Sequence, residues 1–156
     1  MLNNKQGQSL VEVLIGVVLL SVALLALTNA VVRALRAAAY ARDKAEATKL
    51  ATEANEWFRF QRDSLSWGDF ERPAGDYCLN SLPGNWVEDV PAGDCGSNFD
   101  LKTKFQRQVY FDPDDDCEDG PLVEDAIKIT INVAWENGNY DVELVTCLTK
   151  WQVITP

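Results

Sequence analysis

Glu12 is the residue whose chemical type agrees least with its surroundings. It lies near the start of the run from Leu10 to Val32, whose other residues are apolar or small except for one serine, one threonine and one asparagine. A carboxylate inside a membrane span costs on the order of 3 kcal/mol. Burial of this side chain therefore requires either a proton or a cationic partner, and its position predicts a role beyond anchoring.

Four cysteines are the second group of residues that could do chemistry. They all lie in the C-terminal part of the chain, and no two of them have CxxC spacing. In an exported protein an even number of cysteines in such an arrangement predicts disulfide bonds. We therefore expect two disulfides, with three pairings open, among Cys78, Cys95, Cys117 and Cys147.

The acidic run DPDDDCEDG, residues 112–120, is a third candidate. Its alternating acids could supply the oxygen ligands that calcium prefers, and they are Asp112, Asp114, Asp116 and Glu118. The spacing of an EF-hand is absent, because the glycine does not take the sixth position and a cysteine interrupts the acids. We interpret the run as a solvated acidic turn, with a calcium site as the alternative.

Composition excludes several classes of function. The chain has no histidine, so it lacks the commonest general base, the Ser-His and Cys-His pairs and the usual ligands of catalytic zinc. An enzyme is therefore not expected, and neither is a cofactor. Residues 64–156 hold 18 of the 24 acidic residues and 6 of the 14 basic ones. This strongly acidic part argues against binding to nucleic acid or to anionic membranes.

A long N-terminal helix must position Glu12. At about 1.5 Å per residue, the run from Leu10 to Val32 is long enough to cross a bilayer core of about 30 Å. No proline precedes Pro73, and residues 33–66 are rich in good helix formers. One apolar stripe in this second half follows helical spacing and comprises Ala47, Leu50, Ala54, Trp57, Phe58 and Leu65. We expect one helix of about 55 residues, apolar all round at first and amphipathic after Val32.

Residues 126–149 predict a β-hairpin. Alternating apolar runs flank Asn137 and Gly138, and this dipeptide is typical of a type I′ turn. The resulting register places Trp135 opposite Tyr140 on an apolar face. The other pairs on that face are Val133 with Val142, Ile131 with Leu144, Ile129 with Thr146, and Ile127 with Leu148.

The segment KFQRQVYF, residues 104–111, predicts a third strand, although Arg107 interrupts its apolar face. Residues 66–100 are dense in Gly, Pro, Asn and Asp and read as a long loop region with little regular structure. The apolar face of the sheet can be covered by the amphipathic half of the helix. The predicted fold class is thus α+β, with a long N-terminal helix packed on a C-terminal antiparallel sheet.

The hairpin register also bears on the cysteines. Cys147 is opposite Lys128 on the face away from the helix, where it could reach a surface loop that carries Cys117. That pairing would leave Cys78 with Cys95 as a local bridge. The other two pairings remain open.

The first residues resemble a known signal. Gly7 is followed by QSLVEVLIG and preceded by the short leader MLNNKQ with its basic Lys5. This pattern is similar to the class III leader and N-methylation motif of type IV pilins and type II secretion pseudopilins. Gln8 stands where the family usually has phenylalanine. A long helix, a cysteine-bearing loop and a C-terminal sheet are also the plan of a pilin, and the size and weakly patterned middle resemble a minor subunit.

The resemblance implies a sequence of events. The precursor would be inserted in the cytoplasmic membrane, cut after Gly7 and methylated at the new N-terminus, Gln8. Glu12 would then pair with the N-terminal amine of a neighbouring subunit, which is cationic at neutral pH. The corresponding divisions are a leader at 1–7, a filament-core half of the helix at 8–32, an amphipathic half at 33–66 and a globular region at 67–156.

The resemblance also implies partners. They are other pilin subunits, a prepilin peptidase, a platform protein and an assembly ATPase, all acting at the membrane. The globular region would lie outside the membrane, and the filament would be extracellular or periplasmic. Basic residues after the span argue for the reverse orientation by the positive-inside rule, and they are Arg33, Arg36, Arg42 and Lys44.

Two other interpretations of the N-terminus stay open. The first 30 residues could be a secretory signal cut after Ala30, or an uncut anchor for an adhesin or ligand-binding domain. In the second case Trp67 and Trp86, in the loop region, are the tryptophans that could recognise a sugar or a partner.

Overall fold

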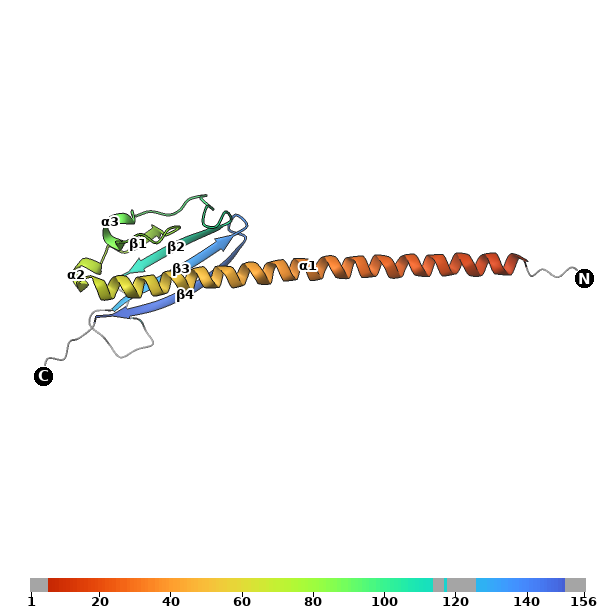
Figure 1. Cartoon of the computed structure of the whole chain (residues 1–156), viewed down its shortest axis with the longest axis horizontal. Helices are drawn as coiled ribbons and strands as arrows, with labels where there is room; N and C mark the ends of the chain where they lie inside the picture. The colour runs from red at the N-terminus through yellow and green to blue at the C-terminus, as the bar shows by residue number, and fades with distance from the viewer. Residues whose placement is uncertain (1–5, 114–116, 118–125, 151–156) are drawn as a thin grey trace, which may run out of the picture. The chain divides into compact units, whose positions relative to one another are not determined.

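The computed structural model describes residues 6–113, 117 and 126–150, with side chains from Leu10 onward. The chain divides into two compact units, Met1–Asp43 and Lys44–Pro156. Figure 1 shows the elements, which in chain order are α1 (Gln6–Ser64), α2 (Trp67–Phe70), β1 (Gly75–Cys78), α3 (Trp86–Asp89), β2 (Phe105–Asp112), β3 (Ala126–Trp135) and β4 (Tyr140–Thr149). The predicted α+β class is confirmed.

Helix α1 runs without interruption through both compositional halves of the N-terminal sequence. The absence of proline and the abundance of Ala and Leu permit this length. Its last turn is closed by Leu65, whose N–H donates to the carbonyl of Gln61 at 3.0 Å. The prediction of a single long helix is therefore confirmed.

The four strands form one antiparallel sheet in the order β1-β2-β3-β4. The β3–β4 register pairs Trp135 with Tyr140, and every predicted pair of the hairpin is confirmed. Asn137 and Gly138 have φ values of 57° and 85°, as a type I′ turn requires, and Glu136 before them is also left-handed at 51°. The predicted third strand is confirmed as β2, one residue shifted at each end.

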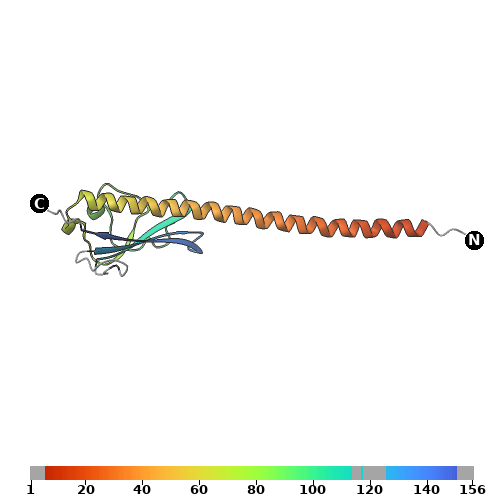
Figure 2. The same cartoon turned by 90° about the horizontal axis from the view of Figure 1, so that it is seen from below.

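The core of the second unit lies between α1 and one face of the sheet, as Figures 1 and 2 show. Ala47, Ala51 and Ala54 are buried on α1, and their small side chains let the helix approach the strands closely. Leu50 and Phe58 fill the larger spaces between them. The strands contribute the alternate residues of their inner faces, among them Val109, Phe111, Ile127, Ile129, Ile131 and Val133.

The segment predicted as irregular, residues 66–100, contains three short elements that sequence reasoning missed. Helices α2 and α3 and strand β1 have four residues each, too few to show a periodicity. Strand β1 forms because it pairs with β2, with Tyr77 opposite Val109. Short elements of this kind depend on tertiary contacts.

Trp86, one of the two loop-region tryptophans considered for ligand recognition, is a core residue instead. It is fully buried, and its indole N–H donates to the carbonyl of Phe70 at 3.0 Å. Its ring packs edge-on against Phe58 and Tyr77, with centroids 5.0 and 4.9 Å away. The guanidinium of Arg72 lies 4.6 Å from the Trp86 ring and 4.4 Å from the Tyr77 ring. The segment 66–100 thus contributes aromatic side chains to the core.

We expect Phe58→Ala to lower the free energy of unfolding by about 3 to 5 kcal/mol, because it leaves a cavity between α1 and the sheet. The matched control is Phe60→Ala on the same helix, where the side chain is 62% exposed. That change should cost about 0.5 kcal/mol or less. Urea unfolding of the two variants with intact disulfides measures the difference, and equal losses would show that the helix does not pack as described.

Candidate functional site

The N-terminal unit presents an apolar surface on all sides of α1. Leu10, Leu19 and Leu35 are 67%, 66% and 66% exposed, and the valines and leucines between them are similarly exposed. A helix long and apolar enough to cross a membrane begins at Leu10, and its most apolar stretch has a mean hydropathy of 2.8. A surface of this composition is stable in a bilayer or among similar helices, and not in water.

Three uncharged polar residues interrupt this surface, and the side chain of each donates a hydrogen bond to a backbone carbonyl of the same helix. Ser21 donates to the carbonyl of Val17 at 2.7 Å, and Thr28 donates to that of Leu24 at 2.7 Å. The side-chain amide of Asn29 donates to the carbonyl of Leu25 at 2.9 Å. Hydrogen bonds of this i to i−4 kind lower the cost of placing polar groups in an apolar environment.

Glu12 differs from these three residues because a carboxylate cannot donate to a helix carbonyl. It is exposed on α1, one helical turn after Gln8 and five residues after Gly7. Gly7 and Gln8 lie in the first turn of α1, and the side chain of Gln8 is not described by the structure. Between Leu10 and Val32 Glu12 is the one charged side chain. When its surroundings become apolar, its partner must come from outside this stretch of helix.

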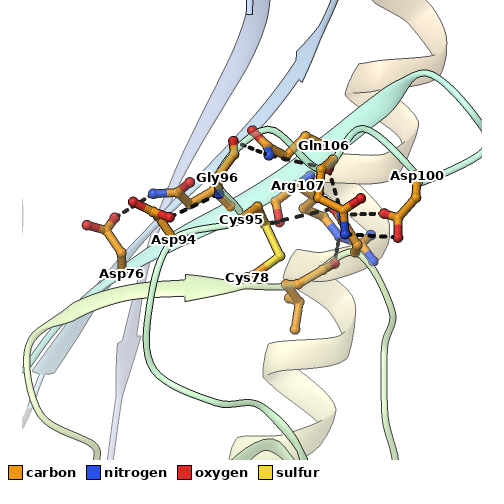
Figure 3. Close-up of a disulfide and its surroundings, with 12 residues drawn as sticks. Asp76, Cys78, Asp94, Cys95, Gly96, Asp100, Gln106 and Arg107 are labelled. Carbon is orange, nitrogen blue, oxygen red and sulfur yellow. Dashed lines mark hydrogen bonds between the residues drawn. A yellow bond between two sulfur atoms is a disulfide. The ribbon is translucent and has the colours of Figure 1, made fainter. Parts of the chain in front are cut away.

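The cysteines form two disulfides, Cys78–Cys95 and Cys117–Cys147. Of the three pairings left open by the sequence, this is the one that the hairpin register favours. In Figure 3 the first bridge joins β1 to the loop that precedes β2. The Cα atoms are 4.8 Å apart in this bridge and 6.2 Å apart in the second. Cys78 and Cys147, one from each bridge, lie on strands β1 and β4 and on the sheet face away from α1.

Arg107 on β2 lies beside the first bridge and is a buried cation that the sequence did not suggest. Its side chain is 2% exposed, since it points into the interior between β2 and α1. Its Nε donates to the carbonyl of Leu79 at 2.7 Å, and an Nη donates to that of Leu50 at 2.9 Å. The carboxylate of Glu53 lies 3.9 Å away. One side chain therefore connects β2, α1 and the segment after β1.

Burial lowers the pKa of Arg107 to about 10, because desolvation disfavours its charge more than Glu53 favours it. The group remains cationic at neutral pH. Since its pKa is lowered by folding, the burial of this cation opposes folding below about pH 10, and this opposition diminishes as the pH rises further. The hydrogen bonds to Leu79 and Leu50 offset this cost at neutral pH.

Asn80 is a second residue near the bridge that sequence reasoning missed. Its side-chain oxygen accepts from the backbone N–H of Arg107 at 2.8 Å. Its amide nitrogen donates to Asp100 at 2.6 Å and to the carbonyl of Asn98 at 3.1 Å. These bonds order the loop that carries Cys95, together with a bond from Gln106 to the carbonyl of Gly96 at 2.9 Å, shown in Figure 3. An asparagine in a turn-rich segment gives no sequence signal for such a role.

The acidic run at 112–120 lies mostly outside the described residues. Asp112 ends β2, whereas Asp114, Asp116 and Glu118 belong to the part that the structure does not describe. Within the described part of the chain, no group of three or more acidic or cysteine side chains is placed to hold a metal ion.

Comparison with known proteins agrees with the N-terminal geometry. The family model of the prokaryotic N-terminal methylation motif matches residues 2–28. No curated protein and no solved structure matches the chain. The matched motif is the signature of type IV pilin and pseudopilin precursors, so the resemblance of the first residues is confirmed.

The rest of the chain is consistent with this signature. A long apolar N-terminal helix and an antiparallel sheet packed on its C-terminal part are a pilin-like layout. The motif belongs to structural subunits rather than to enzymes, and it fits a chain that is anchored in a membrane before it enters a filament.

We expect Arg107→Lys to lower the free energy of unfolding by about 2 kcal/mol, because one ammonium group cannot reproduce the planar geometry that reaches both carbonyls. Arg59→Lys is the matched control, since Arg59 pairs with Glu56 at 3.5 Å on the exposed side of α1. The control should change stability by about 0.5 kcal/mol or less. Urea unfolding at pH 7 measures both variants, and an Arg107→Lys protein as stable as the control would contradict the assigned contacts.

Proposed function

We propose that this chain is a structural subunit, of the minor class, of a type IV pilus or a type II secretion pseudopilus. The observation that carries the proposal is an apolar stretch of helix, Leu10 to Val32, with a single carboxylate, Glu12, which lies five residues after Gly7 and inside the matched motif. In a helix that only anchors a domain in the membrane, this carboxylate costs free energy and gives nothing in return. In a helix that leaves the membrane and packs among copies of itself, it can pair with a cation of another copy.

The prepilin peptidase cuts the precursor after Gly7 and methylates the amino group of Gln8. The new amine is a cation at the start of α1, and it pairs with Glu12 of the adjacent subunit as the helices pack together. The low dielectric between packed helices strengthens this pairing. The helices from Leu10 to Val32 then form the core of the filament, and a platform protein and an ATPase supply the work of extraction.

The globular unit lies outside the cytoplasmic membrane in this proposal. Two disulfides support that orientation, because such bonds persist in oxidising compartments and are rare in the cytosol. Arg33, Arg36, Arg42 and Lys44 follow the span and favour the opposite orientation by the positive-inside rule. Asp43 and Glu46 dilute their effect, and the disulfides outweigh it.

The mature protein should begin at N-methylated Gln8. Intact-mass measurement on the protein from its native host, followed by analysis of the N-terminal peptide, checks this outcome. A Gly7→Leu variant is the control and should keep Met1, because the small residue at the cut is lost. A wild-type chain that begins at Val31 would indicate a secretory signal, and one that keeps Met1 would indicate a simple anchor for an adhesin or ligand-binding domain. Either result overturns the proposal.

We expect Glu12→Ala to be inserted and cut normally but to enter filaments about tenfold less, or not at all, because the amine of its neighbour loses its partner in an apolar core. The control Glu56→Ala removes an exposed acid from the same helix beyond the apolar run. Quantitative blotting of sheared filaments against membranes gives the ratio. Wild-type incorporation of Glu12→Ala would exclude the ion pair as the basis of assembly.

A further inference from the structure

The outer face of the sheet, which is the face away from α1, carries a polar surface that has no part in the proposed pairing of Glu12. The strand register sets Tyr110 opposite Asp76 on β1 and opposite Thr130 on β3, and it sets Gln108 opposite Asn132. All five are on the outer face, because their neighbours along each strand point into the core.

These residues line a depression of about 230 Å³. Its lining consists of Asp76, Gln106, Gln108, Tyr110, Thr130 and Asn132. Cys78 neighbours Gln108 across the strands, so the first disulfide holds a loop at one side of this surface. Tyr110 is 44% exposed, which is enough for its ring to serve as a contact surface for a ligand.

The hydrogen bonds within the depression leave it rich in acceptors. The amide nitrogen of Gln108 donates to Asp76 at 2.9 Å, and that of Asn132 donates to Asp141 at 2.8 Å. The amide oxygens of Gln108 and Asn132 accept no hydrogen bond from any other residue that the structure describes, and neither does the hydroxyl of Tyr110 or Thr130. The two amide oxygens favour a ligand that carries donors, and the hydroxyls of Tyr110 and Thr130 can both donate to it and accept from it.

The charged residues around the depression determine whether it favours a cationic or an anionic ligand. Asp76 lies in it, Asp141 bonds to Asn132, and Glu143 is opposite Asn132 on β4. Lys128, one pleat beyond Thr130 on the same face, is set opposite Asp112. Anionic ligands are disfavoured by these carboxylates, and cationic ones are favoured.

We propose that this depression binds a sugar chain with free amino groups, of the glucosamine type. Its ammonium groups pair with Asp76 and Asp141, and its hydroxyls donate to the amide oxygens of Gln108 and Asn132. The apolar face of a pyranose ring stacks on Tyr110. The site is separate from the helix that carries assembly, so the inference goes beyond the proposed function and does not depend on it.

The test is calorimetric titration of the full-length chain, in detergent micelles and without assembly, with hexaglucosamine. We expect a Kd of about 1 mM or tighter. Tyr110→Ala should weaken binding about fivefold or more, Tyr110→Phe should keep most of it, and Asp76→Asn should weaken it about fivefold. The control Phe60→Ala removes an exposed aromatic ring from α1 and should leave the Kd unchanged. An unchanged melting temperature of each variant shows that folding is intact.

Three further probes decide what is recognised. Maltohexaose and hexa-N-acetylglucosamine lack the ammonium groups and should bind at least about tenfold more weakly than hexaglucosamine. Binding of hexaglucosamine that is absent, or equal to that of the neutral sugars, overturns the proposal. Hexalysine that binds as tightly as hexaglucosamine and is insensitive to Tyr110→Ala also overturns it, because the surface would then recognise basic peptides by charge alone.

Discussion

The apolar side chains of α1 from Leu10 to Val32 face outward on every side, and water is a poor solvent for such a surface. The other features of the N-terminal unit follow from this outward-facing apolar surface. The polar side chains that remain are bonded to their own helix, as with Ser21 and Thr28. Glu12 has no such partner on its own helix, so its burial requires either a proton or a cation, and the run from Leu10 to Val32 carries no cation. The proposed function couples assembly to processing through this one carboxylate.

In the second unit, by contrast, most apolar side chains of α1 are buried. From Ala47 to Phe58 one side of α1 is buried against the sheet, and alanines at the contact allow the close approach. Arg107 adds a polar connection inside this apolar contact, since it reaches backbone carbonyls on α1 and after β1. The two disulfides close loops of 17 and 30 residues, and each contributes on the order of 3 kcal/mol by restricting the unfolded chain. A small unit with one covered sheet face benefits from such bonds.

The two faces of the sheet consequently have different chemistry. The inner face is covered by α1 and holds the core, whereas the outer face carries amides, hydroxyls and carboxylates around Tyr110. Cys78 lies on this outer side next to Gln108, so the first disulfide holds a loop beside that surface. In the two proposals, assembly uses the first half of α1 and ligand binding uses the outer sheet face, so the two functions involve different residues.

The sequence by itself determined the features that repeat with a period or follow a short motif. The length of α1, the hairpin register around Asn137 and Gly138, and the methylation motif were all readable, because each is encoded by neighbouring residues. Tertiary structure alone decided the rest. Strand β1 and helices α2 and α3 are too short to be periodic, and Trp86 became a core residue only through its contacts with Phe58 and Tyr77. Arg107 is a charged residue on the apolar face of its strand, where the sequence offers no reason for a cation. It is buried because its guanidinium donates to backbone carbonyls of two segments that are far apart in the sequence. No local sequence pattern indicates such contacts.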